Sequence, residues 1–433
     1  MPRRHAADGG LLFGPLTKPV RCWGAVAALG MVGLWGCHLA LGLQAPEASD
    51  PLPFQPPPPD AGPDAPAEAS LPPDPCATNA PPSAPDKDDA PDKALPPMFF
   101  LLRTQSFALP DGGLSGINLD GFRTCAEKDT WAKTTASCQS STGDAGCDLT
   151  SCGEDNSLGQ LSRITGTNLL AGNDVEANRG NGALMVYLDD YNGERNDRSV
   201  RVGFARGVGI PEDVGCDGMP RGLSPSGNSQ KLFDQDGGTP LPIYPATHDG
   251  CDRWLLSKED APDILGVPTP GRLSVAYVND GVLVMREATA APFGTGNTAV
   301  DVTAAFLQAR IVVDTDAGAN QRFALSDIVL AGRMPLAQLI PAFGGFTGPN
   351  GKLLCNDKTT YAFVASELCR GADISRSPSL DGQGTSCDSL SAGIFAQLAT
   401  RIAPTLGPNG LGVRVPPACA VEDLLRADFC SNR

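Results

Sequence analysis

Between residues 99 and 333, hydrophobic positions recur in short alternating runs separated by glycine, asparagine and aspartate. The clearest run is Leu273–Met285, which alternates on both sides of the tight-turn sequence Asn279–Gly281. Alternation around such a turn predicts a β-hairpin. The run Val200–Phe204 also alternates, and we expect it to pair with Ala183–Leu188 across the polar loop between them.

Other short runs predict additional strands in the same part of the chain. We expect strands at Phe99–Phe107, Ala299–Val302, Ala309–Val313 and Phe323–Leu330. Many short strands without an intervening helical pattern favour packed antiparallel sheets over a parallel α/β sheet. The sequence therefore predicts a mainly β fold, with an antiparallel β-sandwich or jelly-roll-like core formed by residues 99–333.

After residue 333 the hydrophobic spacing lengthens and predicts helices. Apolar residues recur every four positions at Leu390, Ile394, Leu398 and Ile402, and a helical stripe also runs through Val421–Phe429. Shorter candidates are Met334–Ile340 and Thr359–Arg370. We therefore expect residues 334–433 to form a small helical cap on the β core.

Residues 1–43 have the pattern of an export signal. Basic residues precede an apolar run at residues 22–43. Within this run, Leu34–Cys37 resembles a bacterial lipobox, which implies that Cys37 is acylated and becomes the new N-terminus. An uncleaved transmembrane anchor is the alternative, since about 20 apolar residues can span a bilayer, and cleaved soluble export is a third. All three place the rest of the chain outside the cytoplasm, and the first two attach it to the cell envelope.

A proline-rich segment follows at residues 44–98. It contains 18 prolines, ten acidic residues and two lysines, with few large apolar side chains. Such a segment buries too little apolar surface to offset its ordering entropy, so we expect a disordered stalk. A proline motif that binds another protein is the alternative interpretation.

The charge balance excludes some partners. The formal net charge is −16, from 33 basic and 49 acidic residues, and about half of it lies in the stalk. Nucleic-acid binding needs a basic surface, so nucleic acid is not an expected partner. We expect the partners to be the membrane, through its anchor, and carbohydrate or a surface protein.

The cysteines favour a disulfide framework. Of the 14 cysteines, Cys22 and Cys37 lie in the signal, which leaves twelve in the exported chain. No CxxC motif occurs, which argues against zinc ribbons and thioredoxin-like chemistry. Seven of the twelve precede residue 300, so at least one bridge must connect the two parts if all are paired. Besides Cys76, the expected partners are Cys125, Cys138, Cys147, Cys152, Cys216, Cys251, Cys355, Cys369, Cys387, Cys419 and Cys430.

Several segments carry a family resemblance. They are GINLDGF, GCDLTSCGEDNSLGQL, VYLDDYNGERNDRSVRVG, YVNDGVLV, LLCNDKTTYAF and ELCRGADI. Together they resemble uncharacterised, cysteine-containing exported lipoproteins of predatory and soil bacteria, over most of residues 99–390. The resemblance implies a surface lipoprotein with a β-rich fold, and it implies no activity.

Motifs for catalysis are scarce in this sequence. Beyond the signal region the only histidine is His248, in a turn-like context typical of a loop residue. GxSxG, HExxH and phosphate-loop motifs do not occur. A glycosidase needs only two carboxylates, which a sequence cannot exclude. A sugar-stacking platform could include Trp131, Trp254, Tyr187, Tyr191 and Tyr244, although core packing is the simpler interpretation.

Aspartates cluster in turns, and these turns suggest one metal hypothesis. Ordinary turn chemistry is the leading interpretation, and no cofactor is required. The alternative is a structural calcium site, because calcium prefers carboxylate and amide oxygens. Its candidate ligands are Asp120, Asp148, Asp155 and Asn156.

These patterns together predict an anchored, extracytoplasmic lipoprotein. We expect a non-enzymatic role, as a surface binding or structural module. The alternative is a carboxylate-dependent hydrolase that acts on surface polysaccharide.

Overall fold

The computed structural model describes residues 80–122, 137–140, 153–165, 170–226, 242–257, 260, 263–264, 267–268, 271–288, 291–293, 300–313, 323–344, 353–405 and 430. All of them belong to the second of two units, Leu71–Arg433, which follows Met1–Ser70. The predicted signal, most of the predicted stalk and the predicted helix Val421–Phe429 lie outside the described residues. Within the described ranges, no helix has the length and apolar character required to cross a bilayer.

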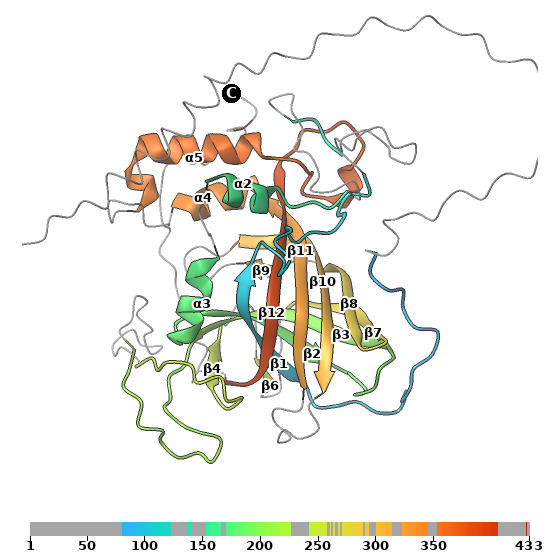
Figure 1. The fold of residues 1–433 in the computed structure, drawn as a ribbon, viewed down its shortest axis with the longest axis vertical. Helices are drawn as coiled ribbons and strands as arrows, with labels where there is room; N and C mark the ends of the chain where they lie inside the picture. Colours follow the sequence, from blue (N-terminus) through green and yellow to red (C-terminus); the bar gives the residue numbers. More distant parts are fainter. Residues whose placement is uncertain are drawn as a thin grey trace, which may run out of the picture. The chain divides into compact units, whose positions relative to one another are not determined.

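Eight antiparallel strands close into a barrel (Figure 1). Their order is β1, β2, β3, β7, β8, β10, β11 and β12, and β12 pairs with β1 to complete the circle. The bounds are β1 Met98–Ser106, β2 Ala183–Asp189, β3 Asp197–Gly209, β7 Leu273–Asn279, β8 Val282–Ala288, β10 Val300–Val313, β11 Phe323–Pro335 and β12 Ser389–Thr405.

Short strands are added outside this circle. β4 (Arg253–Leu256) pairs with β3 and, in parallel, with β12, while β9 (Ala291–Phe293) pairs with β10. β5 (Asp263–Ile264) and β6 (Val267–Pro268) form a separate pair.

The prediction of a mainly β fold is confirmed, but the predicted sandwich or jelly roll is wrong. Phe99 of β1 pairs with Ile402 of β12, so the first and last strands of the barrel are neighbours. Local alternation indicates which face of a strand is buried, and it carries no information on which distant strand becomes the partner. Closure depends on that distant pairing.

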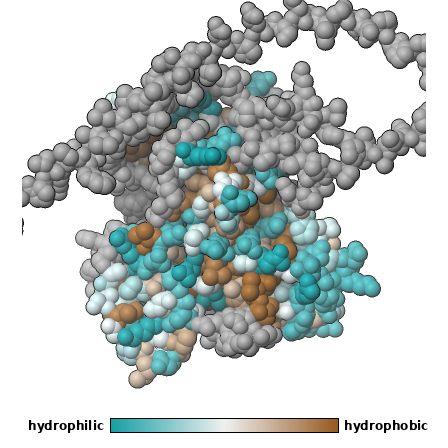
Figure 2. Space-filling view, in the orientation of Figure 1, coloured by the Kyte–Doolittle hydropathy of each residue, from teal (hydrophilic) through white to brown (hydrophobic). Residues whose placement is uncertain are grey.

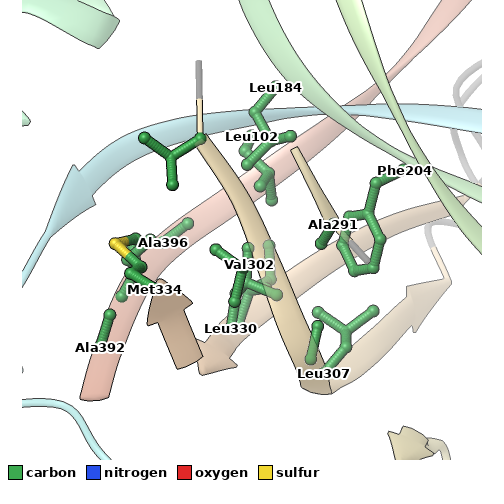
Figure 3. Close-up of a cluster of buried hydrophobic side chains, with 14 of the residues drawn as sticks. Leu102, Leu184, Phe204, Ala291, Val302, Leu307, Leu330, Met334, Ala392 and Ala396 are labelled. Carbon is green, nitrogen blue, oxygen red and sulfur yellow. The ribbon is translucent and has the colours of Figure 1, made fainter. Parts of the chain in front are cut away.

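The barrel interior is filled by apolar side chains from all eight strands. Figure 3 shows Leu102, Leu184, Phe204, Leu307 and Leu330 pointing toward one another inside it. An eight-stranded barrel is just wide enough for side chains to fill its centre. The interior also includes Phe100, Val186, Val202, Ala276, Val278, Leu283, Met285, Leu325, Ile328, Ile394 and Ala396.

A second, smaller core covers part of the outer surface. Phe99, Leu101 and Met185 of β1 and β2 pack there against Trp254 of β4 and Ala177 of helix α3 (Ala171–Asn178). Strands buried on both faces have continuous apolar sequences rather than alternating ones, as in MFFLL and ALMVYL. Trp254 and its neighbour Tyr187 are therefore core residues, which supports the core-packing interpretation for these two aromatic residues.

The predicted helix through Leu390 and Ile402 is wrong, because these residues belong to β12, the longest strand of the barrel. A spacing of four residues fits one helical turn and equally fits two strand repeats of two residues. The intervening small residues Ala392 and Ala396 join Leu390 and Ile394 in the barrel interior. Residues 389–405 therefore complete the barrel instead of forming a helix of the predicted cap.

Other local predictions are confirmed. The hairpin forms from β7 and β8, and Asp280 and Gly281 at its turn have φ of 50° and 76°. β2 pairs with β3 as expected. The two predicted strands around residues 299–313 merge into β10, whose register shifts twice against β11. Two predicted helices are present as α4 (Leu336–Gly344) and α5 (Lys358–Arg370).

Helices α4 and α5 lie at one end of the barrel together with α2 (Ser157–Thr165), which the alternation pattern did not predict (Figure 1). Two single-turn 3-10 helices, η3 (Leu354–Asn356) and η4 (Pro378–Leu380), lie in the same part of the sequence as α5.

Residues 80–97, which the sequence assigned to the stalk, lie against the barrel. We refer to them as the strap. They form neither helix nor strand, yet the Asp89 amide donates to the Asn196 carbonyl at 3.1 Å, and the Leu95 amide donates to the Tyr191 carbonyl at 2.7 Å. The described fold therefore starts at residue 80 and not at residue 99.

Among the residues that the structure describes, three cysteine pairs lie at disulfide distance. Their Cα–Cα separations are 5.1 Å for Cys138–Cys387, 5.0 Å for Cys216–Cys251 and 5.4 Å for Cys369–Cys430. The first connects the parts of the chain before and after residue 300, as the cysteine count required of a fully paired chain. Cys355 is also disulfide-bonded. The remaining predicted cysteines, Cys125, Cys147, Cys152 and Cys419, lie outside the described residues, as do Cys37 and Cys76.

Candidate functional site

A group of polar side chains gathers at the barrel end near α2. We call it the Arg333 cluster, and it comprises Asp120, Arg333, Asp373, Asp381 and Ser391. Arg333 lies near the end of β11, and Ser391 near the start of β12. The three aspartates come from connecting loops. The barrel strands therefore supply two fixed residues, and the loops bring carboxylates to them.

Arg333 is the centre of this cluster. Its side chain is fully buried and makes a bidentate pair with Asp381, at 2.8 and 2.5 Å. The guanidinium also donates to the Ser375 carbonyl at 2.7 Å and to the Leu119 carbonyl at 2.9 Å. These extra hydrogen bonds offset part of the cost of burying the pair, and the buried Nε of Arg333 has no partner among the described residues. Arg333 thus ties two loops to the end of the barrel.

Asp373 is bound by Ser391. The Ser391 amide donates to one carboxylate oxygen at 2.9 Å, and its hydroxyl donates to the other at 2.5 Å. Burial raises the pKa of Asp373 to about 6, and the nearby charge of Asp120 adds to this effect against the lowering by hydrogen bonds. This carboxyl group consequently titrates in a pH range where an exposed aspartate is fully ionised.

Asp120 lies in the same electrostatic environment. Burial raises its pKa most, while hydrogen bonds from the Phe122 amide and Ser137 lower it. The charge of Asp381 raises the pKa further, and the charge of Arg333 lowers it. The cluster therefore holds three carboxyl groups and one guanidinium, and Asp120 interacts electrostatically with Asp373, Asp381 and Arg333.

The structure brings together three of the four predicted calcium ligands but uses them in hydrogen bonds. Asp155 accepts from the Leu119 amide at 2.7 Å, directly beside Asp120 in the sequence. Asn156 caps α2, since its side-chain oxygen accepts from the Gly159 amide at 2.8 Å. The amide nitrogen of Asn156 donates to the Gly393 carbonyl at 2.8 Å.

The fourth predicted ligand, Asp148, lies outside the described residues. Among the residues that are described, no three histidine, cysteine, aspartate or glutamate side chains are grouped so that they could hold a metal ion. The turn aspartates seen here therefore act as hydrogen-bond acceptors for loop backbone.

A disulfide also restrains the loops that carry the Arg333 cluster. Cys138 bonds Cys387, and backbone hydrogen bonds join Gln139 to Thr385 and Cys387 on either side of the bridge. Ser137, next to the bridge, donates to the Asp373 carbonyl at 3.3 Å. The bridge and the buried ion pair act on the same segment and restrict its motion.

His248 belongs to a different polar group. It has φ of 58° in a loop beside the Cys216–Cys251 bridge, and its Nε2 lies 2.8 Å from the side-chain oxygen of Asn178. Its loop is held by the buried Asp252, which accepts from the His248 amide at 2.7 Å and pairs with Arg221 at 2.9 Å. Burial lowers the pKa of His248. This geometry matches the loop role that the sequence indicated.

Sequence reasoning missed Arg333, Asp373, Asp381 and Ser391. Their contacts join positions far apart in the chain, such as Arg333 and Asp381, so spacing gave no signal. The sequence contained one clue, because Arg333 interrupts the apolar run of β11. The structure shows that the residues on either side of it are buried. A charged residue inside such a run is rarely buried without a partner.

We also compared the chain with known proteins. No protein-family model, curated protein or solved structure matches it.

Proposed function

We propose that the protein is a membrane-anchored extracytoplasmic lipoprotein whose barrel is a non-enzymatic binding or structural module, with carbohydrate or another surface protein as its ligand. One observation carries the proposal: the barrel interior is filled with apolar side chains, and the Arg333 cluster fixes loops at its end. Rigid scaffolds that present fixed loops are typical of binding proteins.

The outer surface supports a scaffold role as well. On the face in Figure 2, apolar patches are small and are separated by hydrophilic residues. This is the pattern of strands that have one buried and one solvated face. Cysteine pairs at disulfide distance fit an oxidising compartment outside the cytoplasm.

The anchoring proposal rests on the lipobox-like residues Leu34–Cys37. Cells that produce the full chain would be labelled with radioactive palmitate, and we expect the label in the wild type and its loss in Cys37→Ser. Cys22→Ser is the matched control, because Cys22 lies in the same apolar run and should leave labelling unchanged. Label that persists in Cys37→Ser, or is absent from the wild type, contradicts lipidation at Cys37.

The binding proposal is tested with the full oxidised chain on a glycan array and against purified surface polysaccharide. We expect saturable binding that is lost on reduction of the disulfides, since the loops near Cys138–Cys387 then lose their restraint. Binding to neither carbohydrate nor isolated surface proteins would contradict a ligand-binding role.

A hydrolase that acts through carboxylates is the second candidate, and the Arg333 cluster supplies the carboxyl groups that it would use. Glycosidases use one protonated and one ionised carboxyl group, and burial raises the pKa of both Asp120 and Asp373. Incubation with the same polysaccharide would release reducing ends if this candidate is correct. Activity should then disappear in Asp373→Asn and persist in Asp388→Asn, a half-exposed carboxylate paired with Arg376.

The calcium hypothesis is tested on the same preparation. A thermal melt with EDTA and then with added calcium should show a rise of several degrees if a site binds the native state only. Asp120→Asn should abolish that rise, whereas Asp111→Asn in the exposed turn after β1 should not. An unchanged melt contradicts a calcium site.

A further inference from the structure

The first residues of the strap are held by side chains of β7. The Tyr277 hydroxyl donates to the Pro82 carbonyl at 2.5 Å, and the Asn279 side-chain amide donates to the Ser83 carbonyl at 2.8 Å. Two donors on one strand thus contact two successive carbonyls. The segment Pro81–Pro85 supplies only acceptors at its prolines, because proline has no N–H.

This pattern matches the way proline-containing ligands are recognised. Proline fixes φ, so such a segment loses little conformational freedom when it binds in an extended form. Pro85 is buried in the bound segment, although its neighbours Ala84 and Asp86 are exposed. The spacing Pro82–Pro85 is that of a PxxP motif.

A second set of contacts sets the direction and register of the strap. Asp88 accepts from the Arg198 amide at 2.5 Å, and Asp89 accepts from the Asn196 amide at 3.0 Å. Both acceptors follow the proline motif within four residues. The strap therefore contacts the barrel through a PxxP motif that is followed closely by two carboxylate acceptors.

The apolar part of this surface extends beyond the strap contacts. Val275 lies two residues before Tyr277 and is 73% exposed, the largest exposed fraction among the large hydrophobic residues described. In a strand, residues two apart point to the same face. Val275 therefore continues the Tyr277 face and offers contact area to a longer ligand.

We propose that the outer face of β7 around Tyr277 and Asn279 is a docking site for extended, proline-containing, acidic peptide, which residues 81–89 of this chain occupy in cis. The covalent connection keeps the segment at a high effective concentration, in the millimolar range for short flexible linkers. The cis segment therefore excludes competing peptides from the site in the wild type. This inference is independent of the ligand proposed for the loops at the barrel end.

The test uses the full chain and a fluorescent peptide with the sequence of residues 80–90. In the variant Pro81→Gly, Pro82→Gly, Pro85→Gly the cis motif loses its preformed geometry and the site becomes available. We expect saturable anisotropy changes with this variant and at least tenfold weaker binding to the wild type. A peptide with the three prolines replaced by glycine should not bind either protein.

Tyr277→Phe, added to the triple variant, identifies the site. Loss of one hydrogen bond should weaken peptide binding roughly fivefold. Tyr244→Phe is the matched control, because Tyr244 packs in the smaller core beside α3 and should leave binding unchanged. Absence of peptide binding to a triple variant that retains the wild-type melting temperature overturns the proposal, as does binding that Tyr277→Phe does not alter.

A second measurement applies if the triple variant fails to fold. Hydrogen exchange of the wild type and of Tyr277→Phe alone would then be compared over residues 80–97. Faster exchange in the strap, with unchanged exchange in β7 and β8, supports the docking site. Equal exchange in the two proteins overturns it.

Discussion

The Arg333 cluster and the strap both attach loop segments to the barrel, but they do so with different physics. Arg333 is fully buried and pairs with Asp381, which is 7% exposed, and a disulfide joins the same loops. The strap instead relies on hydrogen bonds near the surface and on the ion pair Lys93–Glu194, whose side chains are about half exposed. Buried pairs are costly to break, whereas exposed pairs contribute little. The first region should unfold with the barrel, and the second should open alone.

The largest expected effect comes from breaking the buried pair. Arg333→Ala leaves Asp381 charged and buried, which should lower the free energy of unfolding by about 3–5 kcal/mol. Urea denaturation of the oxidised chain at neutral pH measures this loss. Arg310→Ala is the control, since Arg310 and its partner Asp327 are both mostly exposed and the expected change is below about 1 kcal/mol. Equal losses in the two variants would contradict a structural role for the cluster.

The next largest effect on stability is expected from removing the disulfide bridges. Replacing Cys138 and Cys387 by serine should cost about 2–5 kcal/mol, and more than replacing Cys216 and Cys251. The first bridge joins residues 249 positions apart and the second joins residues 35 apart. Loop-closure entropy predicts a difference of roughly 2 kcal/mol between the two double variants. Denaturant midpoints of both proteins check the order, and the reverse order would show that native-state effects outweigh chain entropy.

Asp373 should make stability depend on pH. Its folded pKa of about 6 lies above the unfolded value of 3.8, so the folded state binds the proton more tightly. The resulting stabilisation is fully present below the unfolded pKa and is lost as pH rises through about 6. Between pH 5 and pH 8 we expect a loss on the order of 1 kcal/mol.

Asp373→Asn should remove this part of the pH dependence, and urea midpoints at the two pH values measure it. Asp388→Asn, on a carboxylate that is about half exposed, should retain the slope of the wild type. A slope that is identical in Asp373→Asn and the wild type would place the titrating group elsewhere.

The smallest global effect is expected in the strap. Asp89→Ala removes the acceptor for both the amide and the side chain of Asn196. Amide exchange in residues 80–97 should rise about fivefold, equivalent to about 1 kcal/mol, while exchange in the barrel strands stays unchanged. Asp111→Ala, in an exposed turn, should change amide exchange neither in the strap nor in the barrel strands. If exchange accelerates throughout the barrel in Asp89→Ala, the strap is part of the cooperative core.

Prediction from sequence succeeded where the decisive interactions are local. The hairpin turn at Asp280 and Gly281 depends on adjacent residues that adopt positive φ, and its sequence was sufficient. Prediction failed at β12, where a spacing of four residues fits two structures and only contact with β1 and β11 selects the strand. For the candidate calcium ligands, the prediction of proximity was correct, since Asp155 lies beside the loop of Asp120. The carboxylate of Asp155, however, accepts a hydrogen bond from the Leu119 backbone amide.

The sequence by itself determined the β-rich class, the hairpins, the two short helices and the cysteine count that requires a long-range bridge in a fully paired chain. These properties follow from side-chain alternation, turn residues and parity, all of which are local or arithmetical. Only the tertiary structure decided that the sheet closes, that Arg333 meets Asp381, and that the strap docks on Tyr277. Each of these joins residues distant in the chain, and such a contact forms only when the packing of the whole barrel outweighs the entropy of closing the loop between them.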